Sequence, residues 1–323
     1  MTVPARHGIT VPFPGVPLHE HRSWYEEVAA LGYTDVWSAE AGGTDAFTPL
    51  ALAAAWAPTL RLGTAIVPAF TRGAATLAQT VAAMCQAAPG RFALGLGTSS
   101  DVIVERWNGI PFEKPYHRVR DTIRFLRPAL AGEKVTAEYE TFAVRGFRLE
   151  TPVEELPPIL VAALRPGMLR LAGREGDGAI INWLSADDVT TVVSHVGDDK
   201  EIVARIFVLP TEDPDLVRLV GRRAIAAYLN VPVYAAFHEW LGRGEVLEPM
   251  WAAWRAGDRA AATEAIPDSL IDALIVHGSP SDCRAKLAAY EAHGVTTPAP
   301  AILGLGAEAL HETLRDLAPR PTG

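Results

Sequence analysis

RFALGLGTSSDVIVERWNGIPFEKPYHRVR, residues 91–120, carries the clearest sign of fold class in this chain. Residues 92–97 form an unbroken apolar run, and the polar triplet Thr98-Ser99-Ser100 follows at once. Such a run is typical of a parallel strand that is buried on both faces, and the triplet is typical of the loop at its carboxyl end. Ligands of α/β proteins bind at that end of the sheet. The segment therefore predicts a buried strand followed by a ligand-binding loop.

Gly95 and Gly97 leave two interpretations open. Glycines in a strand relieve crowding where a side chain would not fit, and they also let a ligand approach the backbone. A dinucleotide-binding motif needs a third glycine at the start of the next helix, but position 100 is Ser. The two glycines therefore do not indicate a dinucleotide site.

Strand-like and helix-like segments alternate on both sides of this strand, which is typical of βα units around a parallel sheet. The predicted strands are residues 8–12, 35–38, 61–67, 92–97, 159–163, 179–183, 203–209 and 298–303. Eight is the strand number of the TIM (β/α)8 barrel, which forms one domain of about 250 residues or more. We therefore expect residues 1–323 to form a single α/β domain with this barrel and insertions.

Helical periodicity fills the intervals between the predicted strands. The expected helices are 19–31, 49–57, 76–87, 116–131, 167–174, 187–195 and 281–293. Thr48 is the expected N-cap of the second helix, and Ser185 and Asp188 have the spacing of a capping box. Gly32 and Gly294 follow the ends of their helices, as C-terminal glycines do.

Two segments exceed a plain barrel. Residues 133–151 alternate polar and apolar side chains and predict a β-hairpin that turns near Arg145-Gly146, before the fifth strand. Residues 213–273 predict a long helical insertion between the seventh and eighth strands, and we expect it to cover the carboxyl face of the barrel as a lid or as a wall of the substrate site. Most aromatic residues of the insertion are expected to form its own core. Tyr234 and His238 are the candidates for contact with a substrate.

Composition excludes several classes of function. Hydrophobic residues make up 49% of the chain and charged residues 21%, a balance that supports a large core. The net charge of −9 disfavours nucleic acid and anionic membranes as partners. No signal peptide and no membrane-spanning run are recognisable, so a cytoplasmic location is expected. Cys85 and Cys283 lie far apart without a CxxC partner and are expected to be buried thiols.

Metal and hydrolase chemistry fit the sequence poorly. His19 and His21 lie two residues apart and would not share a helix face, so no metal site is expected there. The sequence contains no G-x-S-x-G nucleophile elbow.

Residues 91–120 resemble the bacterial luciferase-like monooxygenase family, and within it the branch that uses the deazaflavin coenzyme F420. In that branch a strand of the form R-F-x-L-G-L-G-T precedes a Trp-x-Gly-x-Pro-Phe loop and a basic helix. The matching residues after the strand are Trp107, Gly109, Pro111, Phe112 and Arg118. The resemblance extends over nearly the whole chain, from the first strand to the C-terminal helix.

This resemblance implies an oxidoreductase that transfers a hydride between coenzyme F420 and an organic small molecule. Two alternatives remain open. The chain could instead be a monooxygenase that uses reduced FMN, or a protein that binds the cofactor without catalysis. The expected pocket walls are fairly apolar, which is compatible with alkenes, imines or aromatic compounds as substrates.

The resemblance also implies which strand ends hold the cofactor. It places a non-prolyl cis peptide at Ala65-Ile66, in a bulge behind the cofactor ring. Backbone and hydroxyl groups of Gly97, Thr98 and Ser99 would reach the ribityl chain or the phosphate. The segment Ala162-Ala163-Leu164-Arg165 leads into a helix start, where backbone N–H groups and Arg165 would bind the cofactor phosphate. Asn182 would bond the edge of the ring and Trp183 would form a wall.

Glu40 is the candidate catalytic residue. In the sugar-phosphate dehydrogenase branch a His stands at the position of Glu40 and an acidic residue at the position of Ser100, so the resemblance does not support sugar-phosphate oxidation here. Glu40 could transfer a proton, or its carboxylate could only fix the loop by hydrogen bonding. Phe13 is expected to form part of the substrate wall.

Residues 50–57 and 76–88 are helical segments rich in Ala. Small side chains let helices approach closely, and the resemblance implies that family dimers use these helices. Ordinary packing on the barrel is the alternative, and a homodimer is the expectation.

Overall fold

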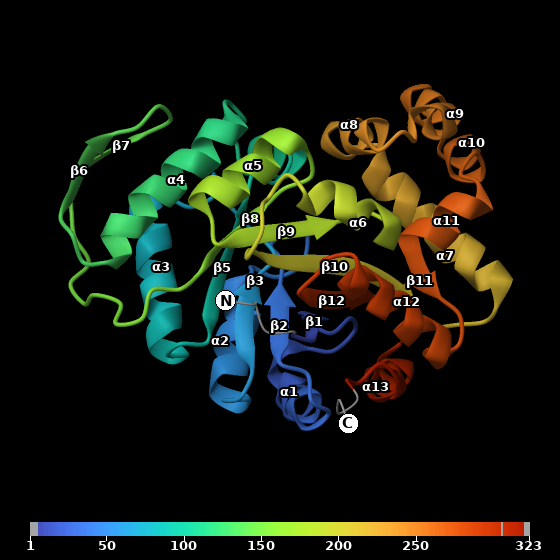
Figure 1. Ribbon diagram of the computed structural model, residues 1–323, viewed down its shortest axis with the longest axis horizontal. Helices are drawn as coiled ribbons and strands as arrows, with labels where there is room; N and C mark the ends of the chain where they lie inside the picture. Colours follow the sequence, from blue (N-terminus) through green and yellow to red (C-terminus); the bar gives the residue numbers. More distant parts are fainter. Residues whose placement is uncertain (1–5, 305, 320–323) are drawn as a thin grey trace.

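The computed structural model describes residues 6–304 and 306–319 and shows a nearly closed barrel of eight parallel strands (Figure 1). The barrel strands are β1 (Gly8–Val11), β2 (Asp35–Ser38), β3 (Arg61–Thr64), β5 (Phe92–Gly97), β8 (Ile159–Ala162), β9 (Gly178–Asn182), β10 (Glu201–Leu209) and β12 (Thr297–Ile302). They are hydrogen-bonded in chain order from β1 to β10, and β12 pairs with β10. The last strand, β12, lies against the first, and the Thr10 hydroxyl donates to the carbonyl of Ala299. The predicted barrel is confirmed.

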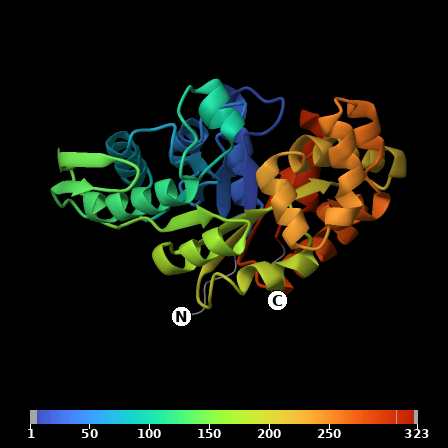
Figure 2. The same ribbon diagram turned by 90° about the horizontal axis from the view of Figure 1, so that it is seen from above.

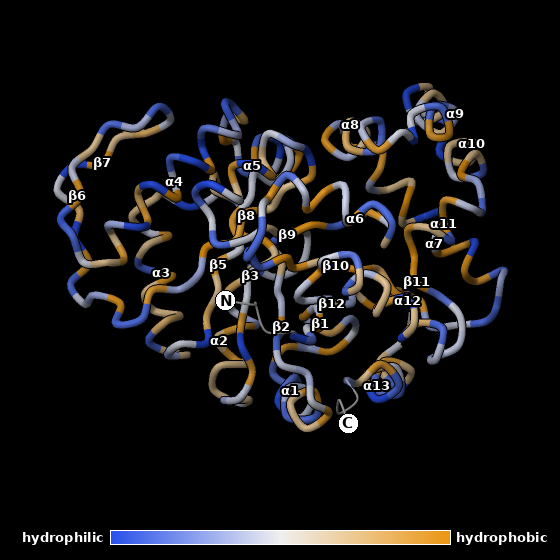
Figure 3. Tube along the Cα trace, viewed as in Figure 1, coloured by the Kyte–Doolittle hydropathy of each residue, from blue (hydrophilic) through white to orange (hydrophobic). Residues whose placement is uncertain are grey.

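Helices cover the outside of the barrel. They are α1 (His21–Ala30), α2 (Phe47–Trp56), α3 (Ala74–Ala87), α4 (Pro115–Leu130), α5 (Pro166–Glu175), α6 (Ala186–Val193), α12 (Pro280–Ala292) and α13 (Ala307–Asp316), with a short 3-10 turn, η1 (Leu18–Glu20), before α1. In α4, buried Val119, Ile123 and Leu126 recur every three or four residues, so one apolar stripe faces the strands. Figure 3 shows apolar residues both along the strands and on the helices that surround them.

Strand pleating determines which side chains enter the barrel. Ile206 of β10 belongs to the large core between strands and helices, whereas Val203 belongs to a smaller interior cluster with Trp37 of β2. Successive strand residues point to opposite faces, so Val203, Arg205 and Phe207 share the inner face of β10. Arg205 pairs in register with Asn182 of β9, so both residues lie near the carboxyl ends of the strands.

The prediction of one continuous strand over residues 61–67 was wrong. Strand β3 ends at Thr64, the Ala65-Ile66 peptide is cis, and a two-residue strand, β4 (Val67–Pro68), then pairs with β5. The cis peptide itself was predicted from the family resemblance and is confirmed. The Thr64 hydroxyl hydrogen-bonds the backbone N–H and carbonyl of Gly95, both at 2.8 Å. This tertiary contact holds β3 and β5 together. The sequence does not reveal it, because residues 92–97 read only as an apolar run.

The hairpin lies within the predicted segment, but the predicted turn was wrong. Its strands are β6 (Val135–Glu138) and β7 (Ala143–Phe147), so the chain reverses at residues 139–142. Gly146 lies inside β7 with φ of 70°, where the strand register shifts, and its N–H donates to the Thr136 hydroxyl. An extra residue with positive φ makes a β-bulge. Glycine marks that bulge rather than the turn.

Helix capping was predicted correctly at one site and wrongly at another. The capping box of Ser185 and Asp188 starts α6, as predicted. Thr48, however, is not the N-cap of α2, because the helix begins at Phe47 and the Asp45 carboxylate accepts from the N–H groups of Phe47 and Thr48. Asp45 therefore takes the capping role that the sequence analysis gave to Thr48.

The helical insertion comprises α7 (Pro214–Leu229), α8 (Pro232–Trp240), α9 (Gly244–Arg255), α10 (Arg259–Glu264) and α11 (Asp268–Leu274). An unpredicted strand, β11 (Ile275–His277), follows and pairs with the end of β10. The insertion has its own apolar cluster, which also includes Trp183, Phe207 and Leu209 from the ends of β9 and β10. It therefore packs on the carboxyl end of the barrel. Figure 2 shows the insertion and the hairpin at opposite ends of the molecule.

Within the described part of the chain, no helix has both the length and the apolar character needed to cross a membrane. Cys85 and Cys283 are buried free thiols, as predicted.

Candidate active site

Three predicted site residues meet where β4, β5 and β8 end. A side-chain carbon added to Gly97 would lie 2.9 Å from Cβ of Ala162 and 3.1 Å from the side chain of Ile66. Carbon atoms in ordinary contact lie about 3.5–4.0 Å apart, so only glycine fits between these two side chains. Tight packing alone therefore accounts for Gly97, which is the first of the two interpretations that the sequence left open.

The loop after β5 continues the site. Ser99 has a left-handed backbone conformation with φ of 61°, and the Thr98 hydroxyl donates to the Ser99 carbonyl. A single π-helical segment, η2 (Val102–Trp107), follows and ends on Trp107, whose side chain is 60% exposed. A side-chain carbon at Gly42 would lie 3.7 Å from the Trp107 ring. The loops after β2 and β5 thus meet at the carboxyl face of the barrel, and an apolar ring stands open to solvent there.

The start of α5 leaves backbone donors available. Arg165 is the N-cap with extended backbone angles, no side chain caps the helix, and Pro166 occupies the first helical position. The first N–H groups of a helix have no partner inside the helix, and the positive end of its dipole favours an anion. The Arg165 side chain is exposed, and nothing lies within 4 Å of a side-chain carbon placed at Gly167. This combination suits a phosphate group.

A polar group that the sequence analysis only partly identified lies at the ends of β9 and β10. The Asn182 amide donates to the Tyr234 hydroxyl at 3.1 Å, which joins the barrel to α8 of the insertion. Burial raises the pKa of Tyr234 above its ordinary value, while the Asn182 hydrogen bond and the charge of Arg205 act in the opposite direction. Arg205 was missed, although a single arginine inside the apolar stretch of residues 202–209 is a recognisable signal.

Glu40 lies beside the cis peptide and is held by an ion pair. Its backbone N–H donates to the Ile66 carbonyl at 3.0 Å, and its carboxylate accepts from Arg72 at 2.5 Å and from the Thr71 hydroxyl at 3.4 Å. The Arg72 guanidinium also lies over the Phe47 ring, 4.9 Å from its centre. The sequence analysis did not identify Arg72. The geometry accommodates both a loop-fixing role and a proton-transfer role for Glu40.

Three predicted site residues are buried rather than exposed to an open pocket. Phe13 is 2% exposed and stacks on Trp24, and Trp183 is 1% exposed and stacks on Phe207. His238 is fully buried. Burial, reinforced by the nearby Arg243 charge, lowers the pKa of His238 to about 4. The structure therefore buries these three side chains rather than exposing them at the carboxyl face of the barrel.

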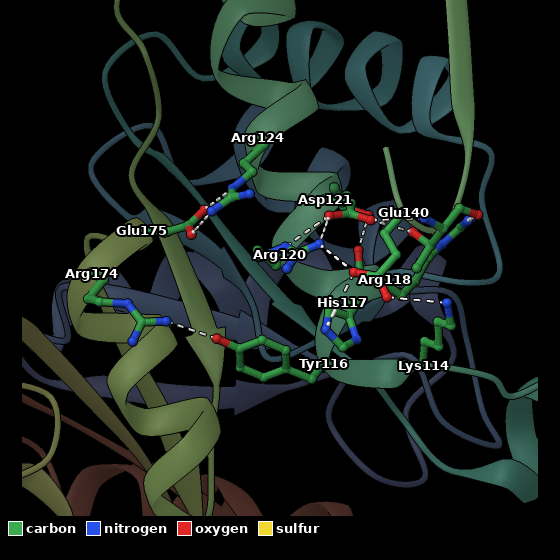
Figure 4. Close-up of polar contacts among 12 residues, drawn as sticks. Lys114, Tyr116, His117, Arg118, Arg120, Asp121, Arg124, Glu140, Arg174 and Glu175 are labelled. Atoms are coloured by element: carbon green, nitrogen blue, oxygen red, sulfur yellow. Dashed lines mark hydrogen bonds and ion pairs between the residues drawn. The ribbon is translucent and has the colours of Figure 1, made fainter. Parts of the chain in front are cut away.

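The basic helix α4 is neutralised along most of its length (Figure 4). Arg118 donates to the carbonyls of Ala69 and Thr141, and so it connects the loop after β4 with the hairpin. Arg174 of α5 donates to the Tyr116 hydroxyl. The carboxylates that pair with the other cations of this group are Asp121, Glu140 and Glu175. These contacts fix α4 and α5 around the site rather than leave an open basic surface.

A nearly closed parallel barrel with polar groups at the carboxyl ends of its strands has the architecture of the (β/α)8 enzymes. More specifically, the chain belongs to the luciferase-like monooxygenase family, whose sequence model matches residues 1–297.

Similar proteins include reductases and an oxidoreductase, two of them named for coenzyme F420. A Mycobacterium tuberculosis protein named as a coenzyme F420-dependent oxidoreductase is 27% identical over 311 residues, covering 87% of this chain and 90% of that protein. The 5,10-methylenetetrahydromethanopterin reductase of Methanolobus tindarius is 26% identical over 280 residues, covering 82% and 84%. The solved coenzyme F420 dependent tetrahydromethanopterin reductase of Methanopyrus kandleri superposes with a TM-score of 0.81 at 18% identity, covering 98% of both chains.

Proposed function

We propose that this protein is an oxidoreductase that binds coenzyme F420 and transfers a hydride between its deazaflavin ring and an organic small molecule. The observation that carries the proposal is the uncapped start of α5 with exposed Arg165, at the carboxyl end of a barrel strand. The relative named as a coenzyme F420-dependent oxidoreductase supports the choice of cofactor.

The residues present fit a phosphorylated ring cofactor. Backbone donors at the start of α5, together with Arg165, are suited to the phosphate, and Thr98 and Ser99 are suited to the polyol chain. Asn182 lies on the inner face near the carboxyl end of β9, within reach of a ring edge. When bound, the deazaflavin would supply the hydride chemistry, and the chain would supply binding, orientation and exclusion of water.

The chain offers one carboxylate for proton transfer. Glu40 is anchored to the Ile66 carbonyl through its own backbone, so its side chain is fixed relative to the residues proposed to support the ring. Arg72 and Thr71 hold one orientation of the carboxylate. A proton donor or acceptor held in this way needs no reorientation when a substrate binds.

Fluorescence titration of the purified protein with F420, and in parallel with FMN, tests the proposal. We expect F420 to bind more tightly than FMN, and Arg165→Ala to weaken F420 binding about tenfold, because charge-assisted contacts to phosphate are lost. Arg170→Ala is the matched control, since Arg170 is an exposed arginine of the same helix. It should leave the affinity nearly unchanged.

If the protein binds FMN more tightly than F420, the FMN-dependent monooxygenase alternative replaces this proposal. Equal losses in Arg165→Ala and Arg170→Ala would reject the phosphate site at α5. A screen of alkenes, imines and carbonyl compounds for F420-dependent turnover separates an enzyme from a protein that only binds the cofactor, which would show no turnover with any of them.

A further inference from the structure

Arg205 is a charged residue in an apolar position. On the inner face of β10 it lies between Val203, which belongs to the barrel-interior cluster, and Phe207, which belongs to the cluster of the helical insertion. Its guanidinium lies 4.9 Å from the centre of the Phe207 ring. In register, its neighbours are Asn182 on β9 and Ala299 on β12. The cation therefore lies at the junction of the barrel and the lid-like insertion.

In the part of the chain that the structure describes, the guanidinium has no acidic partner. Its Nε is shielded from solvent and has no hydrogen-bond partner among the described residues. A second arginine of the barrel does have acidic partners. At the opposite, amino end of the strands, Arg61 forms ion pairs with both Glu201 and Asp35. Arg205 is only partly buried, so its terminal nitrogens keep access to solvent and to a ligand. A cation retained under these conditions is suited to an anion that arrives from outside the chain.

A second donor lies beside Arg205. The Tyr234 hydroxyl accepts a hydrogen bond from Asn182, and this leaves its own proton free to donate. Arg205 pairs in register with Asn182, whose amide donates to Tyr234, so the guanidinium and the hydroxyl lie at the same end of the strands. A guanidinium and a phenolic proton together match the two oxygens of a carboxylate.

The side chains near Arg205 are small and add few polar groups to these two donors. Ala299 flanks Arg205 on β12, and Ala162 and Gly97 occupy inner positions at the ends of β8 and β5. A wall of such small residues provides no carboxylate that could compete for the cation.

We propose that Arg205 and Tyr234 form a subsite that recognises a carboxylate group of the substrate, so that the organic molecule used by this protein is an acid. The inference rests on the proposed function in one respect: it takes the carboxyl end of the barrel as the substrate site. Binding of a carboxylate to that site, however, can be measured without any cofactor.

Calorimetric titration of the cofactor-free protein with benzoate and benzamide, and with crotonate and crotonamide, tests the subsite. Each pair differs only in the anionic group. We expect the acid to bind at least about tenfold more tightly than its amide, as a charge-assisted contact predicts. Arg205→Met should abolish this preference, and Arg205→Lys should restore part of it. Tyr234→Phe should reduce it, and Arg170→Met on the surface of α5 should leave it unchanged.

Thermal unfolding tests the role of Arg205 independently of ligand binding. Arg205→Met should lower the melting temperature by no more than a few degrees, because it breaks no ion pair among the described residues and loses only the cation–π contact with Phe207. A larger fall would show that Arg205 has a further structural partner and would overturn the subsite.

Further binding results also decide whether Arg205 and Tyr234 form the carboxylate subsite. Equal binding of acid and amide to the unaltered protein overturns the proposal, as does an acid preference that survives in Arg205→Met. A variant that loses F420 affinity but keeps the acid preference would assign Arg205 to the cofactor instead. Failure of the unaltered protein to bind F420, with the acid preference intact, would reject the proposed function and leave the subsite standing.

Discussion

His238 gives a testable pH dependence at the scale of a single residue. Its imidazole is fully buried, and its pKa falls from an ordinary value near 6.5 to about 4. The unfolded chain therefore takes up a proton below pH 6.5, whereas the folded protein does so only near pH 4. Stability contributed by the neutral imidazole is complete above pH 6.5 and is lost as the pH falls toward 4.

Urea unfolding at pH 7 and pH 5 measures this effect. We expect the His238 contribution to cost about 2 kcal/mol of unfolding free energy between these two pH values. His238→Leu should have a correspondingly smaller loss over the same interval, while His19→Leu, which replaces an exposed histidine, should behave like the unaltered protein. The same loss in His238→Leu as in the unaltered protein would show that other groups determine the acid sensitivity.

Substitutions of Glu40 and Arg72 distinguish two roles for the Glu40 carboxylate. If Glu40 transfers a proton, Glu40→Gln should lower kcat by about 10²-fold or more with little change in KM. Arg72→Met keeps the carboxylate but removes its ion pair, so its loss should be smaller. Steady-state kinetics on a substrate found by screening makes the measurement. Equal losses in kcat in both variants would mean that Glu40 only fixes the loop.

At the scale of an element, β5 depends on Gly95. A side-chain carbon there would lie 1.8 Å from the Thr64 carbonyl oxygen, a backbone atom that cannot rotate away. The substitution would also disturb the two hydrogen bonds between Gly95 and the Thr64 hydroxyl. We expect Gly95→Ala to destabilise the protein by about 3 kcal/mol or more, at the upper end for overpacking.

Thermal and urea unfolding measure the effect of Gly95→Ala. Gly43→Ala is the control, because nothing lies within 4 Å of the added carbon and the residue is exposed. An unchanged unfolding midpoint in Gly95→Ala would mean that β3 and β5 can separate at little cost.

Sequence patterns predicted elements best where local signals agree with tertiary packing. Strand 92–97 has the predicted boundaries, because its apolar run ends at a polar triplet. Gly146 misled the prediction of the hairpin turn, since positive φ serves a bulge as well as a turn and only the cross-strand register distinguishes them. The short strand β11 forms because the insertion returns the chain to β10, and its three residues carry too little periodicity to be recognised.

At the scale of the whole molecule, the barrel and the location of its site could be predicted, but the pairing within the site could not. Repeated βα alternation is a property of the chain itself, and it places every strand end on one face. The contact between Glu40 and Arg72 and the solitary Arg205 depend on how strands and loops meet in space. Burial of Phe13 and His238 likewise follows from the packing of α1 and α8, which periodicity does not reveal.

The last prediction concerns assembly. Helices α2 and α3 lie side by side, and their outer surfaces include exposed Ala51, Ala55, Ala83 and Ala87, a surface with small side chains and no charge at these positions. Such a surface lets a second copy approach closely, so we expect a homodimer. Light scattering should give the mass of two chains, and Ala83→Glu should shift the protein toward monomer, because a buried unpaired carboxylate opposes association. Ala252→Glu, on the exposed surface of α9, should remain dimeric. A mass of one chain for the unaltered protein at all working concentrations would contradict the dimer, and dissociation of both variants would place the interface elsewhere.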